Sequence, residues 1–163
     1  MQKKILDPWP RGRRFWIAAL AATSMAALAG CSAFAMSEED AGKHYMGIVC
    51  PSNATVDGYN AALETGDLSQ IQTAAKTMAE AYRESAKALS STDTQWPDAI
   101  AEADLQTLAN SYLTDLAVIN AITSATTVDE ARVIWPNDPA VGEASQRVRL
   151  ALDLPSDTSL GCE

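Results

Sequence analysis

The chain has 163 residues and a formal net charge of −9 at pH 7. Residues 1–30 hold five basic residues and one acidic residue, so the other 133 hold 7 basic and 20 acidic ones, a net charge of −13. An acidic domain of this kind repels phosphate backbones, which excludes nucleic acid as an expected partner. The length fits one domain, and the periodic apolar residues exclude a disordered chain.

The first 30 residues have the layout of a secretory signal peptide. Residues 1–14 are basic, and an uncharged apolar run of about 14 residues follows at 15–28. That run is short for a membrane-spanning helix, which needs roughly 20 residues. We therefore expect export and cleavage between Gly30 and Cys31. The pair Arg13-Arg14 suits either the general or the twin-arginine export route, and the sequence leaves this choice open.

The motif Leu28-Ala29-Gly30-Cys31 resembles the lipobox of bacterial lipoproteins. The resemblance implies a diacylglycerol on the thiol of Cys31 and anchoring at the extracytoplasmic face of the cell membrane. The membrane is then a partner through lipid, and two or three acyl chains give stable anchoring where one is marginal. The alternative is an ordinary signal peptide followed by a coincidental cysteine. The lipobox divides the chain into a signal peptide (1–30), a lipidated tether (31–37) and a folded domain (38–163).

The first part of the domain predicts two helices. One covers residues 38–49, begins at a Ser37 cap and ends before Pro51, because the residue before proline disfavours helix. The next is capped within residues 52–55 and ends at Gly66.

Four further segments have the periodicity and caps of helices. Apolar residues spaced three and four apart predict a long helix over 68–89. Proline at a helix start predicts another long helix over 97–122. A capping box at residues 127–130 begins a short helix ending at Trp135-Pro136, and residues 138–154 form the last one. The predicted fold is an all-α bundle with two long antiparallel helices and shorter helices packed against them.

Cys50 and Cys162 remain once Cys31 is assigned to lipid. An exported domain meets oxidising conditions, so an even pair of cysteines predicts a disulfide. The alternative is a redox or metal site, but no Cys-x-x-Cys motif accompanies either residue. We expect a structural disulfide.

His44 is the single histidine of the chain. With Met46 it could suggest a metal or haem site, yet residues two apart on a helix do not share a face. No Gly-x-Ser-x-Gly elbow accompanies it for nucleophilic catalysis. We expect a packing or surface role for His44, with no cofactor, no metal and no catalytic residue.

Trp96 and Trp135 each precede a proline at a helix border. Each tryptophan either packs over one end of the bundle or contacts a ligand or a partner. We favour packing, because a core rich in alanine gains most from large aromatic side chains. A sizeable apolar cavity beside either tryptophan would favour ligand contact.

The segments Lys43-His44-Tyr45 and 50–53, with the ending 154–162, resemble small helical lipoproteins of actinobacteria that have no assigned activity. This resemblance implies an envelope location and no catalytic residues. The resulting hypothesis is a non-enzymatic, membrane-anchored binding or scaffolding module with an envelope protein as partner. The alternatives are a carrier of a small ligand or metal in an inter-helix pocket and, third, an envelope enzyme.

Overall fold

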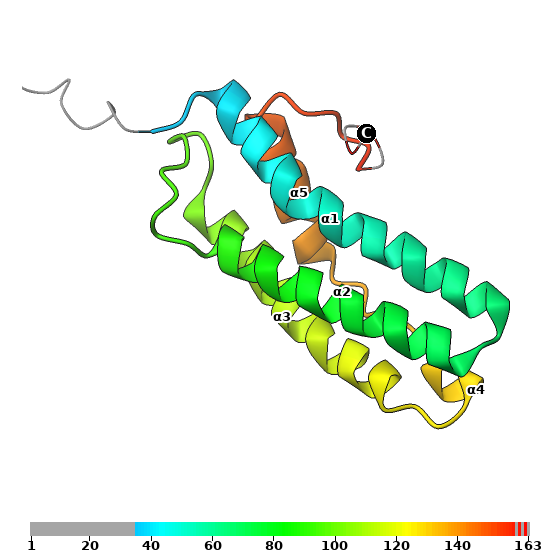
Figure 1. The fold of residues 1–163 in the computed structure, drawn as a ribbon. Coiled ribbons are helices and arrows are strands. Elements are labelled where there is room, and N and C mark those ends of the chain that lie inside the picture. Colours follow the sequence, from blue (N-terminus) through cyan, green and yellow to red (C-terminus); the bar gives the residue numbers. More distant parts are fainter. Residues whose placement is uncertain (1–34, 159, 161, 163) are drawn as a thin grey trace, which may run out of the picture. The chain divides into compact units, whose positions relative to one another are not determined.

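The computed structural model describes residues 35–158 together with residues 160 and 162. Over these residues the chain forms helices and no strand, so the all-α prediction is confirmed (Figure 1). The signal peptide, the cleavage site Gly30-Cys31 and the tether up to residue 34 lie outside the described residues. The helices are α1 (Glu38–Thr65), α2 (Leu68–Leu89), α3 (Glu102–Thr123), α4 (Val128–Ala131) and α5 (Pro139–Ala151).

Helix α1 is continuous through Pro51, so the prediction of two helices separated at that proline is wrong. Proline removes one backbone hydrogen bond and usually bends a helix, at a cost of about 3 kcal/mol. Here its ring is exposed, while the buried residues before and after it stay on the face that packs against α2. Ser52, predicted as a possible cap, is instead buried and hydrogen-bonds Ser85 of α2 at 2.7 Å. Packing along the whole helix therefore outweighs the local break, and the bundle has three long helices rather than two.

Two other boundaries differ from the prediction. Helix α3 begins at Glu102, because Pro97 and Ile100 form a buried turn in which the Ile100 amide donates to the Pro97 carbonyl at 2.9 Å. Helix α4 ends at Ala131, and residues 132–138 are irregular. The Ala131 carbonyl accepts a hydrogen bond from the Tyr59 hydroxyl, a contact made across the bundle.

Helices α1, α2 and α3 run up, down and up, with α2 in contact with both neighbours (Figure 1). The fourth position of the bundle is filled by residues 128–151, which we call the interrupted fourth helix. It consists of α4 against α2 and α3, the irregular residues 132–138, and α5 against α3. The predicted start of α5 at Asp138-Pro139 is confirmed, because the Asp138 carboxylate accepts from the Ala140 amide at 2.9 Å.

The interior is divided into two hydrophobic clusters along the bundle. The first cluster lies among α1, the end of α2, α3 and α5, near the start of α1. The second lies among α1, α2, α3 and α4, toward the other end. The buried side chain of Met78 belongs to the second cluster, and Tyr112 packs against both. The first cluster consists of Ala41, Tyr45, Ile48, Val49, Leu89, Ile100, Leu105, Leu108, Ala109, Ala144, Val148 and Leu152. The second cluster consists of Tyr59, Ala62, Ile71, Ala75, Met78, Ala79, Tyr82, Ile119, Ile122, Ala125 and Ala131.

Candidate functional site

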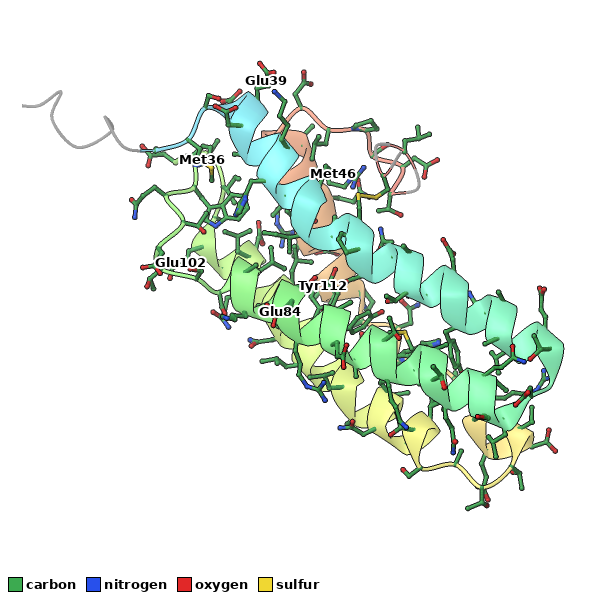
Figure 2. All side chains as sticks on the ribbon, in the orientation of Figure 1. Met36, Glu39, Met46, Glu84, Glu102 and Tyr112 are labelled. Carbon is green, nitrogen blue, oxygen red and sulfur yellow. A yellow bond between two sulfur atoms is a disulfide. The ribbon has the colours of Figure 1, made fainter. Side chains whose placement is uncertain are left out.

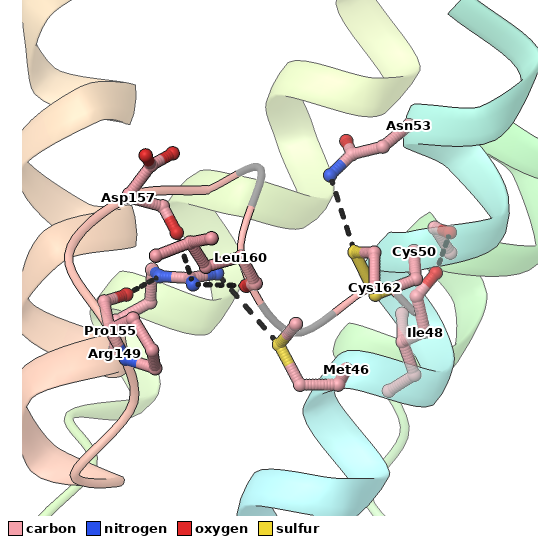
Figure 3. Close-up of a disulfide and its surroundings, with 10 residues drawn as sticks. Met46, Ile48, Cys50, Asn53, Arg149, Pro155, Asp157, Leu160 and Cys162 are labelled. Atoms are coloured by element: carbon pink, nitrogen blue, oxygen red, sulfur yellow. Dashed lines mark hydrogen bonds between the residues drawn. A yellow bond between two sulfur atoms is a disulfide. The ribbon is translucent and has the colours of Figure 1, made fainter. Parts of the chain in front are cut away.

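The predicted disulfide between Cys50 and Cys162 is present (Figure 3). Its Cα atoms are 5.2 Å apart and its partners are separated by 112 residues. Cys50 lies on α1, directly before Pro51, and Cys162 lies in the tail that follows α5. The bond therefore attaches the end of the described chain to the middle of the first helix.

Arg149 holds the same tail from the other side (Figure 3). Its side chain is 2% exposed, and its guanidinium donates to the carbonyls of Pro155 at 2.6 Å, Asp157 at 2.9 Å and Leu160 at 3.3 Å. The planar guanidinium carries several N–H donors, so it can hydrogen-bond several backbone carbonyls of the tail at once. No sequence pattern indicates this role, because the tail carbonyls reach Arg149 only after the chain turns back. Arg149 and the disulfide together fix the tail.

Trp96 lies over the first cluster and Trp135 over the second. The Trp96 ring is 5.3 Å from the ring of His44, and the Trp135 ring is 6.2 Å from Tyr59 in an edge-to-face pair. Trp96 also borders an open groove of about 430 Å³ beside the loop before α3. Its buried indole N–H has no hydrogen-bond partner. Each tryptophan thus contributes packing at one cluster, and the groove beside Trp96 is lined by polar as well as apolar side chains.

A group of hydroxyls occupies the centre of the bundle, where α1, α2 and α3 meet around Tyr112 (Figure 2). Tyr82 and Tyr112 form an edge-to-face pair with centroids 4.9 Å apart. Burial raises the pKa of Tyr82 to about 12, and burial, with the nearby hydroxyls of Tyr45 and Tyr82, raises the pKa of Tyr112. The Ser85 hydroxyl donates to the Ile48 carbonyl at 2.8 Å. These phenols stay neutral and act as packing and hydrogen-bonding groups.

Two aspartates on α3 have opposite environments. Asp104 accepts three hydrogen bonds of 2.8–3.1 Å from the Arg147 guanidinium of α5, which holds the pKa of that carboxyl below its usual value. Asp115 is half-buried, and burial raises the pKa of its carboxyl. Asp104 is 8% exposed and joins α3 to α5. Its partner lies 43 residues away, which no local pattern can reveal.

Asp115 borders a groove between α3 and residues 136–142, with a volume of about 530 Å³. We call it the α3–α5 groove. It lies where the fourth helix is interrupted, because residues 136–138 line it together with the start of α5. Like the groove beside Trp96, this groove has room for a small molecule beside polar groups.

Within the described part of the chain, no group of three or more His, Cys, Asp or Glu side chains is placed to hold a metal ion. None of the described helices combines the length and the apolar character needed to cross a membrane. No model of a known family, no curated protein and no solved structure matches this chain.

Proposed function

We propose that the chain is a cell-envelope lipoprotein, cleaved between Gly30 and Cys31 and anchored by lipid on Cys31 to the extracytoplasmic face of the membrane. The observation that carries the proposal is the disulfide between Cys50 and Cys162. A disulfide of this kind persists in an exported, oxidising compartment. It also uses two of the three cysteines in the chain, so Cys31, the lipobox residue, is the one outside the bond.

The start of the folded domain supports display close to the membrane. The Met36 amide donates to the Gln95 carbonyl at 3.0 Å, so the backbone is fixed to the loop before α3 from residue 36 onward. Four residues, 32–35, separate this point from Cys31. Because the domain is strongly acidic, an anionic membrane surface repels it. The lipid is then the means of attachment.

Metabolic labelling with an alkyne-bearing fatty acid tests the anchor. We expect label on the membrane-extracted protein and an intact mass that corresponds to a chain beginning at Cys31 with its acyl groups. The Cys31→Ser variant loses the label and leaves the membrane fraction. The matched variant Cys50→Ser/Cys162→Ser keeps the label. A labelled Cys31→Ser protein, or a mature chain that begins at another residue, contradicts the proposal.

The anchored domain acts, in this proposal, as a non-enzymatic binding or scaffolding module for an envelope protein. The side chain of Ile134 supports a partner surface, because it is 96% exposed while its neighbours Val133 and Trp135 pack against the second cluster. An exposed large apolar side chain between two packed ones is a suitable anchor for a protein partner.

A photo-crosslinking amino acid at position 134 tests the partner surface in the intact envelope. We expect a discrete adduct of constant mass from position 134. The control places the same amino acid at the exposed position Glu80 on α2, where we expect no adduct. Equal adducts at both positions, or none at either, contradict a specific surface at Ile134.

The second candidate function is a carrier of a small ligand. The α3–α5 groove favours it, because its volume of about 530 Å³ lies within the usual range for small-molecule sites.

A further inference from the structure

The wall of the α3–α5 groove formed by α3 is rich in hydrogen-bond acceptors. Thr107, Ser111 and Thr114 line it at intervals of three and four residues, which places them on one helix face. Their hydroxyls donate to backbone carbonyls of the same helix, at 2.8 Å for Thr107 and Ser111 and 2.9 Å for Thr114. Each proton is therefore already used, and each oxygen keeps lone pairs for a donor in the groove.

Asp115 completes this wall with a charge that nothing in the described chain neutralises. No described residue donates a hydrogen bond to its carboxylate or forms an ion pair with it. Burial raises the pKa of the carboxyl, and no described group lowers it. The carboxylate is partly desolvated yet borders the open groove, so a cation that enters the groove can reach it.

The opposite wall, at the start of α5, adds a second carboxylate and apolar surface. Asp138 lines the groove while it caps the Ala140 amide at 2.9 Å, and the amides of Val141 and Gly142 donate to the Asp138 carbonyl. These backbone donors are used within the turn, so the helix start offers little to an anion. No Lys, Arg or His side chain lines the groove, and its two acids make it negative.

We propose that the α3–α5 groove binds a primary alkylammonium group, with the Asp115 carboxylate as its counter-ion. The hydroxyl oxygens of Ser111 and Thr114 accept the remaining N–H bonds, and the alkyl chain lies against Val141 and the prolines of the opposite wall. The strongly acidic domain attracts such a cation from a distance. The inference rests on the second candidate function, the small-ligand carrier, and not on the lipid anchor.

Two sources could supply this group: a free alkylamine or diamine, and the lysine side chain of a partner protein. Calorimetric titration of the full chain in non-ionic detergent separates them. The probes are n-butylamine, putrescine, Nα-acetyl-lysine-methylamide and, as a neutral control of similar shape, n-butanol. We expect the amines to bind and n-butanol not to bind. Stronger binding of the lysine derivative indicates a protein side chain, and stronger binding of the free amines indicates a small molecule; both support the site.

Two variants locate the binding in the groove. Asp115→Asn keeps the shape of the side chain and removes the charge, so we expect amine binding to weaken about ten-fold or more, since hydrogen bonds to charged groups are among the strong ones. Thr114→Val, which removes one acceptor, weakens binding by a few-fold. The matched control Asp57→Asn, at an exposed site on α1, binds like the wild type.

Unchanged binding in Asp115→Asn, binding of n-butanol equal to that of n-butylamine, or no binding of any amine in the millimolar range overturns the proposal. Titration of the Cys31→Ser variant with the amines tests the groove independently of the proposed lipid anchor. That variant keeps amine binding if the groove is a site, whatever the outcome of the lipid labelling.

Discussion

The two hydrophobic clusters are closed in different ways. The first is closed by the C-terminal tail, which is fixed by the Cys50–Cys162 disulfide and by the guanidinium of Arg149. The second is closed by α4 and Trp135, through apolar packing and a hydrogen bond from Tyr59. The first cluster thus depends on a covalent bond between residues 112 positions apart and on the contacts of Arg149 with the tail, and the second depends mainly on apolar packing.

This difference indicates how stability is distributed along the bundle. The end that carries the tail has a covalent bond and buried polar contacts, which specify one arrangement of the chain. The other end has apolar side chains whose contribution follows the area they bury. Each end should therefore respond to a different kind of change, and the following predictions test that separation.

The largest effect should come from removal of the disulfide. In the chain-entropy model, closing a loop of this length stabilises the fold by about 4–5 kcal/mol. We expect Cys50→Ser/Cys162→Ser to lower the free energy of unfolding in urea by up to about this amount. Hydrogen exchange should become faster first at α5 and the start of α1, while amides around Ile119 keep their relative order of protection. Equal loss of protection in both clusters contradicts the separation.

The next effect concerns the second cluster with the disulfide intact. Ile119 is fully buried there, so Ile119→Ala should lower the free energy of unfolding by about 2–5 kcal/mol through lost burial and the cavity that remains. Leu113→Ala on the same helix is the control: this side chain is 53% exposed, and its removal should change stability by about 0.5 kcal/mol or less. Similar losses for both variants would show that packing in this cluster is loose.

A smaller effect is expected at the turn between α1 and α2. Gly66 caps α1 with a φ of 67°, which side chains disfavour. Gly66→Ala should lower the free energy of unfolding by about 1 kcal/mol. Gly66→Asn should cost less, because asparagine tolerates this conformation better than alanine does. Thermal unfolding of the two variants measures the difference, and the reverse order would contradict the assigned cap.

The smallest effect depends on pH and compares the two aspartates of α3. Arg147 lowers the folded-state pKa of Asp104, so this pair contributes stability above the ordinary pKa of 3.8 and loses it as pH falls through the lowered value. Burial raises the pKa of Asp115, so protonation of that group stabilises the fold as pH falls through its raised value.

Urea unfolding between acid and neutral pH distinguishes the two groups. Arg147→Gln should be less stable than the wild type at neutral pH, with the difference shrinking in acid. Asp115→Asn should be more stable than the wild type at neutral pH, with that difference also shrinking in acid. A pH-independent difference for either variant shows that the pairing or the burial has another energetic basis.

The sequence predicts those parts of the fold that depend on local spacing. The helix predicted over 68–89 is α2 with the same limits, because apolar residues three and four apart share one helix face. The Asp138 cap of α5 is local in the same way. The disulfide follows from compartment and cysteine count, since Cys50 and Cys162 have one partner each once Cys31 is set aside.

The remaining features depend on contacts between distant parts of the chain. Pro51 predicts a break by its local chemistry, yet the packing of the whole α1 face against α2 keeps the helix continuous. Arg149 looks like any basic residue until the tail returns to it. Asp115 shares its groove with residues 136–142, more than 20 positions away, so no local sequence pattern could identify the groove.

The long span of the disulfide has a consequence for biogenesis. If the chain is exported unfolded, as the general route of the proposed function requires, Cys50 would cross the membrane before Cys162, and the native bond could form only after Cys162 has followed. During such export, the Cys50 thiol would be reduced and its native partner would not yet be present, so it could pair with another cysteine. On the proposed lipidation, the thiol of Cys31 carries a thioether and cannot compete for it. Acylation would then have two effects. It would locate the protein at the membrane, and it would prevent Cys31 from forming a non-native disulfide with either of the other two cysteines.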